Sequence, residues 1–327
     1  MGWFTRGTAR GGADEREGAR GVPREVLARV QQLRIRTHRL VDAGLAGGYR
    51  STFRGQGIEF EEVRPYEPGD DVRSIDWRVT ARTGEPYVKR FREERQLTIH
   101  LLVDTALELD FASRGRTKRE AAAALAALIG FVGARHQDRV GLTLFGPEPG
   151  EHLRPKSDPR HVMRLVRELY SAPVTRGGSS LTKALRGTEQ ALRRRRAVVF
   201  VISDFASIAD DGTEGGTMEW SDTLGRLANR HDVIAVRVID PLEEALPSAG
   251  LVRIERLSGG GAPVALDTRS AAARAAWSAW AKARREALAR AFRAARTEWV
   301  DVRTDADPTA PLMAFFKRRA SRAGRAL

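Results

Sequence analysis

Three aspartates are placed where their carboxylates could do chemistry, because each closely follows an apolar run of strand length. With the runs that they follow, they are Asp104 (Leu97–Val103), Asp204 (Ala197–Ile202) and Asp240 (Val233–Ile239). The carboxyl ends of parallel strands meet at one edge of a sheet, where open α/β folds bind their ligands. We therefore expect these carboxylates to lie at one edge, either holding a cation or capping the strand ends.

A second concentration of reactive side chains is the segment Gly55–Arg95, in which acidic and basic residues are closely interleaved. Asp70, Asp71 and Asp76 could form a carboxylate cluster of the kind that holds a catalytic metal ion. Arginines stand between and after them, however, and a guanidinium pairs bidentately with a carboxylate. An ion-pair network is therefore the favoured interpretation of this segment.

The same segment predicts two strands around one helix. Ile58–Tyr66 and Pro86–Arg92 have extended patterns. Between them Asp71 is placed to cap a helix, because its carboxylate can accept the free amides of the first turn. Apolar residues at spacings of three and four then predict one helix as far as Arg82, with Gly84 ending it.

The common signatures of enzymes are absent from the sequence. There is no glycine-rich phosphate loop followed by Lys-Ser/Thr, no G-x-S-x-G nucleophile motif and no cysteine. The six histidines show no paired spacing of a metal site, and His100, inside an expected strand, is interpreted as a hydrogen-bonded structural residue. The sequence therefore favours a protein that is not an enzyme.

Strand and helix patterns alternate along the rest of the chain, which predicts an α/β fold with a mostly parallel sheet and helices on both faces. The other expected elements are helices over Val22–Leu45, Lys118–Arg135, Asp158–Tyr170, Leu181–Arg195, Trp220–Arg230 and Ser270–Trp299, strands over Arg139–Phe145 and Trp299–Arg303, an edge piece at Glu151–Pro155, a hairpin of Leu251–Leu257 with Pro263–Leu266, and a final helix from Pro311.

Composition restricts the partners and the compartment. The formal net charge is +14, but arginine outnumbers lysine 50 to 6 and the surplus is scattered, without a platform of aromatic and basic residues that would stack bases. Nucleic acid is therefore not favoured as a partner. No apolar run reaches the roughly 20 residues that span a bilayer. The chain has no cysteine, and we expect it in the cytoplasm.

One long motif resembles a known family. The run GxGxEFEEVRPYxPGDDVRSIDWxxTARTGEPYVKRFxEER, over Gly55–Arg95, is similar to the signature of the bacterial "domain of unknown function 58" family. The resemblance implies a von Willebrand factor A-like fold and a MoxR-type AAA+ ATPase as partner. The expected organisation is a disordered lead-in over 1–21, an N-terminal helix and signature segment over 22–95, a von Willebrand A-like domain over 96–308 and a basic C-terminal helix and tail over 309–327.

The resemblance also implies a divalent cation site, which this sequence has in altered form. The family's fold carries D-x-S-x-S after its first strand, and here Asp104 matches while Ala106 and Glu108 replace both serines. Ser179 matches a hydroxyl ligand from a glycine loop, and Asp204 matches a later carboxylate. Glu108 could take a serine's place, but it would neutralise the ion. We predict a degenerate site with weak or absent Mg²⁺ affinity and no other cofactor.

These observations lead to one expected function and two alternatives. We expect a non-enzymatic adaptor or chaperone-like partner of a MoxR-type ATPase that also binds a client protein of unknown identity. Its predicted interaction face comprises Glu59, Arg64, Asp70, Asp71, Arg73, Asp76, Trp77 and Arg82. One alternative is a metal-dependent phosphoesterase or nuclease that uses Asp104, Glu108 and Asp204. The other is a basic scaffold associated with RNA or a membrane.

Overall fold

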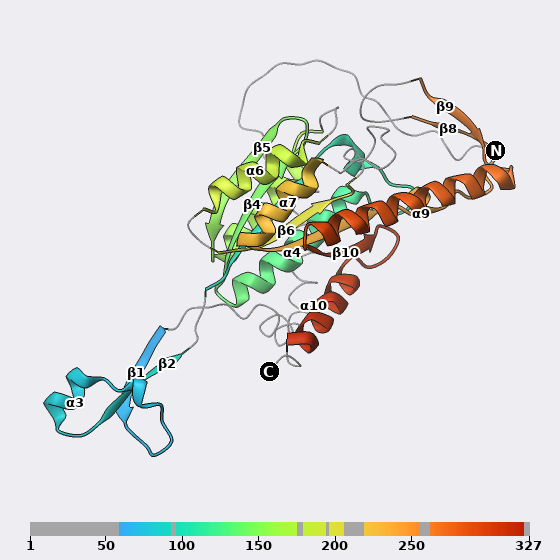
Figure 1. Ribbon diagram of the computed structural model, residues 1–327. Coiled ribbons are helices and arrows are strands. Elements are labelled where there is room, and N and C mark those ends of the chain that lie inside the picture. The colour runs from blue at the N-terminus through green and yellow to red at the C-terminus, as the bar shows by residue number, and fades with distance from the viewer. Residues whose placement is uncertain are drawn as a thin grey trace, which may run out of the picture.

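The computed structural model describes residues 59–92, 96–174, 179–193, 196–205, 219–255 and 262–323. The predicted helix over Val22–Leu45 and the N-terminal lead-in lie outside these residues. Six strands form the central sheet in the order β10-β7-β6-β3-β4-β5, and every neighbouring pair is parallel except β4 and β5 (Figure 1). The predicted fold class, an α/β fold with a mostly parallel sheet and helices on both faces, is confirmed.

The elements of this domain follow the expected alternation. The strands of the sheet are β3 (Thr98–Asp104), β4 (Arg139–Phe145), β5 (Pro149–Lys156), β6 (Val198–Ser203), β7 (Asp232–Ile239) and β10 (Glu298–Arg303). The helices are η3 (Leu107–Asp110), α4 (Lys118–Arg135), α5 (Pro159–Ser171), α6 (Leu181–Ala191), α7 (Glu219–Arg230), α8 (Pro241–Glu244), α9 (Ala271–Ala294) and α10 (Thr309–Ala323). A separate hairpin pairs β8 (Leu251–Ile254) with β9 (Val264–Asp267).

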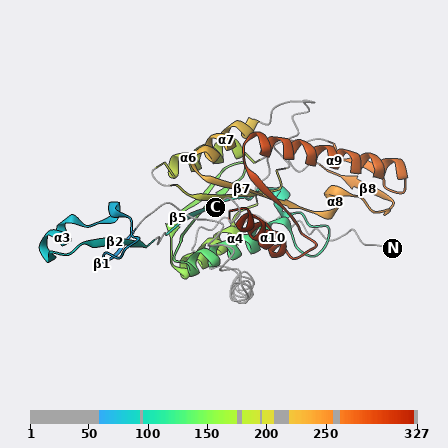
Figure 2. The ribbon, with the colours of Figure 1, turned by 60° about the horizontal axis from the view of Figure 1, so that its bottom comes forward.

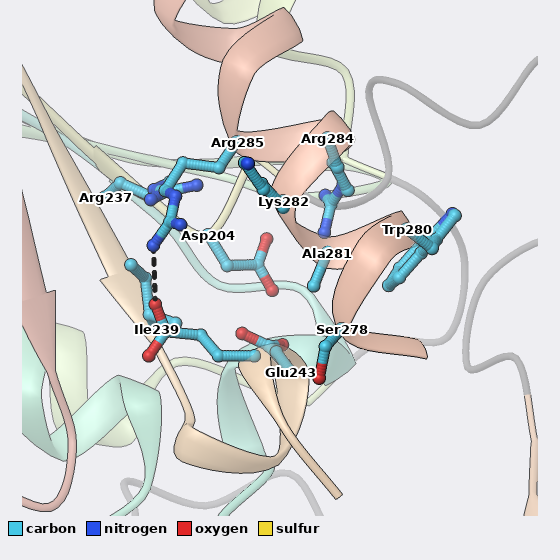
Figure 3. A pocket seen from close by; sticks show the side chains of 11 residues that line it. Asp204, Arg237, Ile239, Glu243, Ser278, Trp280, Ala281, Lys282, Arg284 and Arg285 are labelled. Atoms are coloured by element: carbon cyan, nitrogen blue, oxygen red, sulfur yellow. Dashed lines mark hydrogen bonds and ion pairs between the residues drawn. The ribbon is translucent and has the colours of Figure 1, made fainter. Parts of the chain in front are cut away.

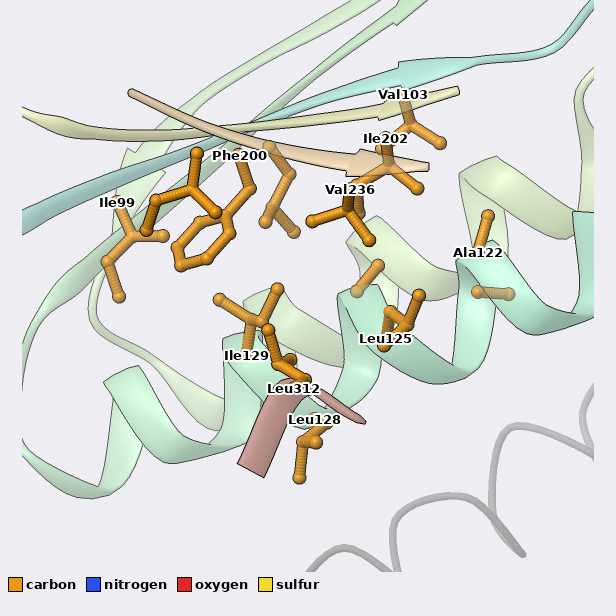
Figure 4. Packing of buried hydrophobic residues seen from close by; sticks show 14 of the residues in the cluster. Ile99, Val103, Ala122, Leu125, Leu128, Ile129, Phe200, Ile202, Val236 and Leu312 are labelled. Atoms are coloured by element: carbon orange, nitrogen blue, oxygen red, sulfur yellow. The ribbon is translucent and has the colours of Figure 1, made fainter. Parts of the chain in front are cut away.

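Helices cover both faces of the sheet, so its central strands are buried on both sides. Figure 2 shows α6, α7 and α9 on one face and α4 and α10 on the other. In Figure 4 Ile99, Phe200 and Val236 point from the strands toward Leu125 of α4 and Leu312 of α10. Burial on two faces explains the near-continuous apolar runs of β3, β6 and β7.

Helices α6 and α9 end several residues earlier than expected. Helix α6 ends at Ala191 and not at Arg195, because Leu192 forms the C-cap and turns into the core with only 6% exposure. The long helix α9 ends at Ala294 and not at Trp299, because Arg296 has a positive φ of 53° and breaks the helical path. The chain then enters β10, in which Trp299 is the second residue.

The signature segment folds as a small unit, which we call the hairpin unit: β1 (Glu59–Pro65), the 3₁₀ turn η2 (Val72–Ser74), α3 (Trp77–Thr83) and β2 (Tyr87–Arg92). Its strands pair antiparallel, and it stands away from the central sheet in Figures 1 and 2. The prediction of a single helix up to Arg82 is wrong. Ile75 bridges to Val88 and interrupts the helix, and Asp76 then caps a second one that ends at left-handed Gly84.

The order of the strands sets the position of a ligand site. From β3 the chain first adds β4 and β5 on one side and then crosses back to add β6, β7 and β10 on the other. The strand order therefore reverses between β3 and β6, whose carboxyl ends bear Asp104 and Ser203. In α/β sheets such a reversal leaves a crevice between the two connections, where ligands bind.

Candidate functional site: the strand-end edge

The site at this reversal, which we call the strand-end edge, brings together three residues expected there. Asp104, the last residue of β3, accepts hydrogen bonds at Oδ1 from Ser179 Oγ (2.5 Å) and from the Ala106 amide (3.0 Å). Its Oδ2 accepts from Ser203 Oγ at 2.7 Å. Asp204 follows Ser203 directly. Asp104 is therefore held by two hydroxyls and an amide, all donating toward its carboxylate.

A lysine lies among these carboxylates. Lys118 Nζ is 2.5 Å from Asp204 Oδ2 and 2.5 Å from Glu243 Oε1. The side chains of Lys118 and Asp204 are 2% and 3% exposed, whereas that of Glu243 is 27% exposed. Helix α4 begins at Lys118, where the helix dipole disfavours a cation. The two carboxylates offset that unfavourable position.

Burial and charge set the protonation of this group. Burial alone would lower the pKa of Lys118, but the charges of Asp204 and Glu243 raise it above the ordinary value, so the side chain is an ammonium. For Asp104, burial and then the charge of Asp204 raise the pKa to about 6, against the hydrogen bonds from Ser179, Ala106 and Ser203. The edge thus contains one fixed cation and a carboxylate that is difficult to ionise.

No hydrogen bond or ion pair among the described residues joins Glu108 to this group. It lies in the short helix η3 and is 9% exposed. Both of its carboxylate oxygens are buried without a hydrogen-bond partner in the described part of the chain. The nearby Asp110 instead pairs with Arg119, whose Nε lies 2.6 Å from its Oδ1.

The third strand-end aspartate is a cap. Asp240 accepts hydrogen bonds from the amides of Leu242 (2.9 Å) and Ser113 (2.8 Å) and from the Thr304 hydroxyl (3.3 Å). It begins α8 and joins that helix to the loop before α4 and to the end of β10. Of the two roles expected for these aspartates, Asp240 therefore has the capping one.

The arrangement does not fit the divalent cation that the family resemblance implies. Asp104 directs both of its oxygens to hydroxyl donors, and Asp204 accepts from an ammonium. A divalent ion between them would lie within a few ångströms of Lys118, and two unit charges 4 Å apart already repel by about 4 kcal/mol at an effective dielectric constant of 20. Among the described residues, no group of three or more His, Asp and Glu side chains is arranged to hold a metal ion.

A pocket opens beside the strand-end edge, between α8 and α9. Figure 3 shows Asp204 near its centre, with Lys282 and Arg284 of α9 on one side and Glu243 on the other. Arg284 donates to the Phe205 carbonyl (2.9 Å) and lies over the ring of Trp280. The pocket is therefore lined by charges of both signs and one exposed aromatic ring.

The predicted interaction face divides into structural and exposed residues. Arg64 pairs with Asp70 at 2.7 Å, and Asp71 and Asp76 cap η2 and α3 by accepting backbone amides. The residues that extend into solvent are Arg73, Trp77 and Arg82, and the tryptophan is 67% exposed. Glu59 lies in β1, but its side chain is outside the described part. The favoured ion-pair interpretation therefore applies to Arg64 and Asp70, and capping explains the other two aspartates.

Sequence reasoning missed Lys118, Ser203 and Glu243. Lys118 is 86 residues from Asp204 and 125 residues from Glu243 along the chain, so no local spacing relates them. Ser203 offered a signal, because it adjoins Asp204 at the end of an apolar strand. Lys118 offered a weaker one, since a lysine that begins a helix is unfavourable unless carboxylates are near.

Comparisons with known proteins place the chain in a family. Residues 62–287 match the family described as "Protein of unknown function DUF58". "Uncharacterized protein Rv1480" of Mycobacterium tuberculosis is 31% identical over 307 residues, covering 92% of each chain. Among solved structures, the chain is similar to the conserved hypothetical protein BatB of Bacteroides thetaiotaomicron, with 13% identity and a TM-score of 0.42 over 70% of this chain and 99% of that one. It is also similar to the vWF domain of the type V pili tip protein Mfa5 of Porphyromonas gingivalis, with 13% identity and a TM-score of 0.34 over 70% of this chain and 95% of that one.

Proposed function

Because this chain belongs to the family described as "Protein of unknown function DUF58", we propose that it is a non-enzymatic adaptor or chaperone-like partner of a MoxR-type AAA+ ATPase. The hairpin unit and the strand-end edge are its two contact regions, one for the ATPase and the other for a client protein. We assign the ATPase to the hairpin unit.

The proposed location is the cytoplasm, where ATP is available to such a machine. In the described part of the chain, no helix has the length and apolar character needed to cross a membrane.

The observation that carries this proposal is the exposure of Trp77 on a unit that stands away from the sheet. Trp77 is 67% and Val72 59% exposed, and of the hairpin-unit side chains that the structure describes only Val88 is buried. Tryptophan and arginine are the residues most enriched at the energetic centres of protein interfaces. A tryptophan on a projecting hairpin, with the exposed Arg73 and Arg82 on the same unit, therefore supports a docking role.

The strand-end edge supports a binding role more than a hydrolytic one. Metal-dependent hydrolysis needs carboxylates that are free to hold an ion and a water molecule. Asp104 and Asp204 instead accept hydrogen bonds from Ser179, Ser203 and Lys118. The pocket beside them offers exposed basic side chains and Trp280, which suit contact with a protein.

Co-elution of purified proteins tests the proposal. The chain and the MoxR-type ATPase from the same genome are mixed with ATP and Mg²⁺ and separated by size-exclusion chromatography. We expect one complex with the wild-type chain and its loss with Trp77→Ala plus Arg82→Ala. The matched control is Leu251→Ala plus Arg253→Ala, which removes an exposed apolar residue and an exposed arginine from β8. No complex with the wild-type chain, or equal loss with both double variants, would reject the proposal.

A further inference from the structure

The strand-end edge contains its own cation. Lys118 Nζ contacts carboxylates from two other segments, Asp204 after β6 and Glu243 in α8. The side chains of Lys118 and Asp204 are 2% and 3% exposed, so the ammonium, and not a dissolved cation, offsets the charge of Asp204. The ammonium therefore links the start of α4, the end of β6 and the short helix α8 that follows β7, which are far apart in the sequence.

Lys118 contacts one of the two carboxylates that a bound metal ion would join, Asp204, and pairs it with Glu243. In the fold that the chain resembles, a divalent cation joins the carboxylate after the first strand to a later strand-end carboxylate. Here the later carboxylate, Asp204, accepts from Lys118, and both oxygens of Asp104 accept from serine hydroxyls. Serine hydroxyls that could have been metal ligands are used to hold Asp104 in place.

We propose that the Lys118 ammonium stands in the place of the divalent cation and holds the strand-end edge together without any metal. A lysine side chain is covalently part of the protein and is not released as a bound ion is, so the edge does not respond to the metal concentration. Any partner that contacts this edge therefore binds without a bridging metal ion. This inference goes beyond the adaptor role, because it concerns the chain alone and holds whichever partner it has.

Removal of the ammonium should reveal the metal preference of the remaining oxygens. Lys118→Met leaves the buried carboxylates Asp104 and Asp204, with Glu243, without their compensating positive charge. Breaking a buried ion pair by removing one partner is strongly destabilising, and we expect Tm to fall by on the order of 10 °C. Carboxylate and hydroxyl oxygens suit Mn²⁺ and Mg²⁺, so the variant should gain binding of these ions.

The experiment measures Tm and free Mn²⁺, the latter by electron paramagnetic resonance, for the wild-type chain and two variants. We expect the wild type to bind no Mn²⁺ at millimolar concentration and its Tm to be the same in Mn²⁺ and in EDTA. Lys118→Met should have a lower Tm, and Mn²⁺ should raise it again. Because the variant binds Mn²⁺, the resonance signal of the free ion should decrease. Lys282→Met, which removes an exposed lysine of the adjacent pocket, should resemble the wild type in both measurements.

Three results would overturn the inference. The first is Mn²⁺ binding by the wild type that Asp104→Ala abolishes, and this measurement is decisive even if Lys118→Met does not fold. The second is an unchanged Tm for Lys118→Met. The third is a lower Tm that Mn²⁺ does not raise, because the ammonium would then stabilise the edge without occupying the place of a cation. None of these outcomes depends on the ATPase, so failure of the inference and failure of the adaptor proposal are distinguishable.

Discussion

Lys118 and Asp204 form a buried ion pair with 2.5 Å between Nζ and Oδ2, at the point where the strand order of the sheet reverses. The pair joins the first turn of α4 to the end of β6, which are neighbours in space because β3 and β6 are adjacent strands. It supplies positive charge to an edge whose other groups are carboxylates and hydroxyls. The predictions below concern this edge, the sheet behind it and the hairpin unit.

Asp104 should make the protein less stable as the pH rises. Its pKa is raised in the folded state to about 6 by burial and by the charge of Asp204, so between pH 4 and 6 the folded state binds more protons than the unfolded state. Stability from this group is therefore present below pH 4 and is lost as the pH rises through 6.

Asp104→Asn should remove that dependence. The free energy of unfolding of the variant relative to the wild type should increase by up to about 2 kcal/mol between pH 4 and pH 7, as measured by urea unfolding across the range. The change with pH is the informative quantity, because Asn also alters the hydrogen bonds from Ser179 and Ser203. A difference between the two proteins that stays constant with pH would contradict this account of Asp104.

His100 should make the protein less stable in acid. It lies buried in β3, and its Nε2 is hydrogen-bonded to Thr143 Oγ1 at 2.8 Å, in agreement with the structural role predicted for it. Burial, and then the charges of His152 and His231, lower its pKa to about 3. The unfolded chain therefore binds an additional proton between pH 6.5 and 3, and stability falls as the pH decreases through this range.

His100→Gln should remove this part of the acid sensitivity. Between pH 7 and pH 4 the wild type should lose on the order of 2 to 3 kcal/mol more stability than the variant. Thermal unfolding monitored by circular dichroism at several pH values measures the difference. Parallel loss of stability in the two proteins would show that His100 is protonated in the folded state as readily as in the unfolded state.

Asp76 should act on the hairpin unit alone. Its carboxylate accepts the amides of Arg78 and Val79 and so caps α3, and loss of such a cap costs about 1 kcal/mol. Asp76→Ala should therefore speed hydrogen exchange at the amides of Thr80 and Gly84, whose helical bonds follow the cap, and leave the Tm of the sheet domain nearly unchanged. A fall in the global Tm by several degrees would mean that the hairpin unit and the sheet unfold together.

The role of Asp76 also affects how its variants are interpreted. Asp76 belongs to the predicted interaction face, yet because it is a cap its loss would weaken binding indirectly, through the stability of α3. Trp77 and Arg82 are more informative positions, because their exposure lets truncation remove contact surface with little change in packing.

The strands and helices of the sheet domain could be predicted well because the pattern of apolar residues that identifies each of them is local in the sequence. The apolar runs of β3 and β6 and the alanine-rich face of α4 each identify their own element, and the bounds of α4 and β4 were predicted correctly. The split between η2 and α3 was missed, because the isolated bridge from Ile75 to Val88 involves a partner across the hairpin. Helical spacing alone could not detect that partner.

The site was predicted only in part, for the same reason. Asp104, Ser179 and Asp204 could be expected together from the family resemblance and from the meeting of strand ends. The partner that changes their chemistry, Lys118, begins a helix with the sequence KREAAA, which has the pattern of a solvated first turn. Only the position of α4 beside β6 brings this lysine to Asp204.

The most direct test of the proposed function is the equilibrium affinity of the purified chain for the purified MoxR-type ATPase in ATP, measured by biolayer interferometry. We predict saturable binding that Trp77→Ala plus Arg82→Ala weakens by about tenfold or more and that Leu251→Ala plus Arg253→Ala leaves unchanged. Treatment of the chain with EDTA before the measurement should have no effect, since the ATPase is assigned to the hairpin unit and not to the strand-end edge. The absence of binding, or equal affinity for the wild type and the Trp77 double variant, would contradict the proposed role.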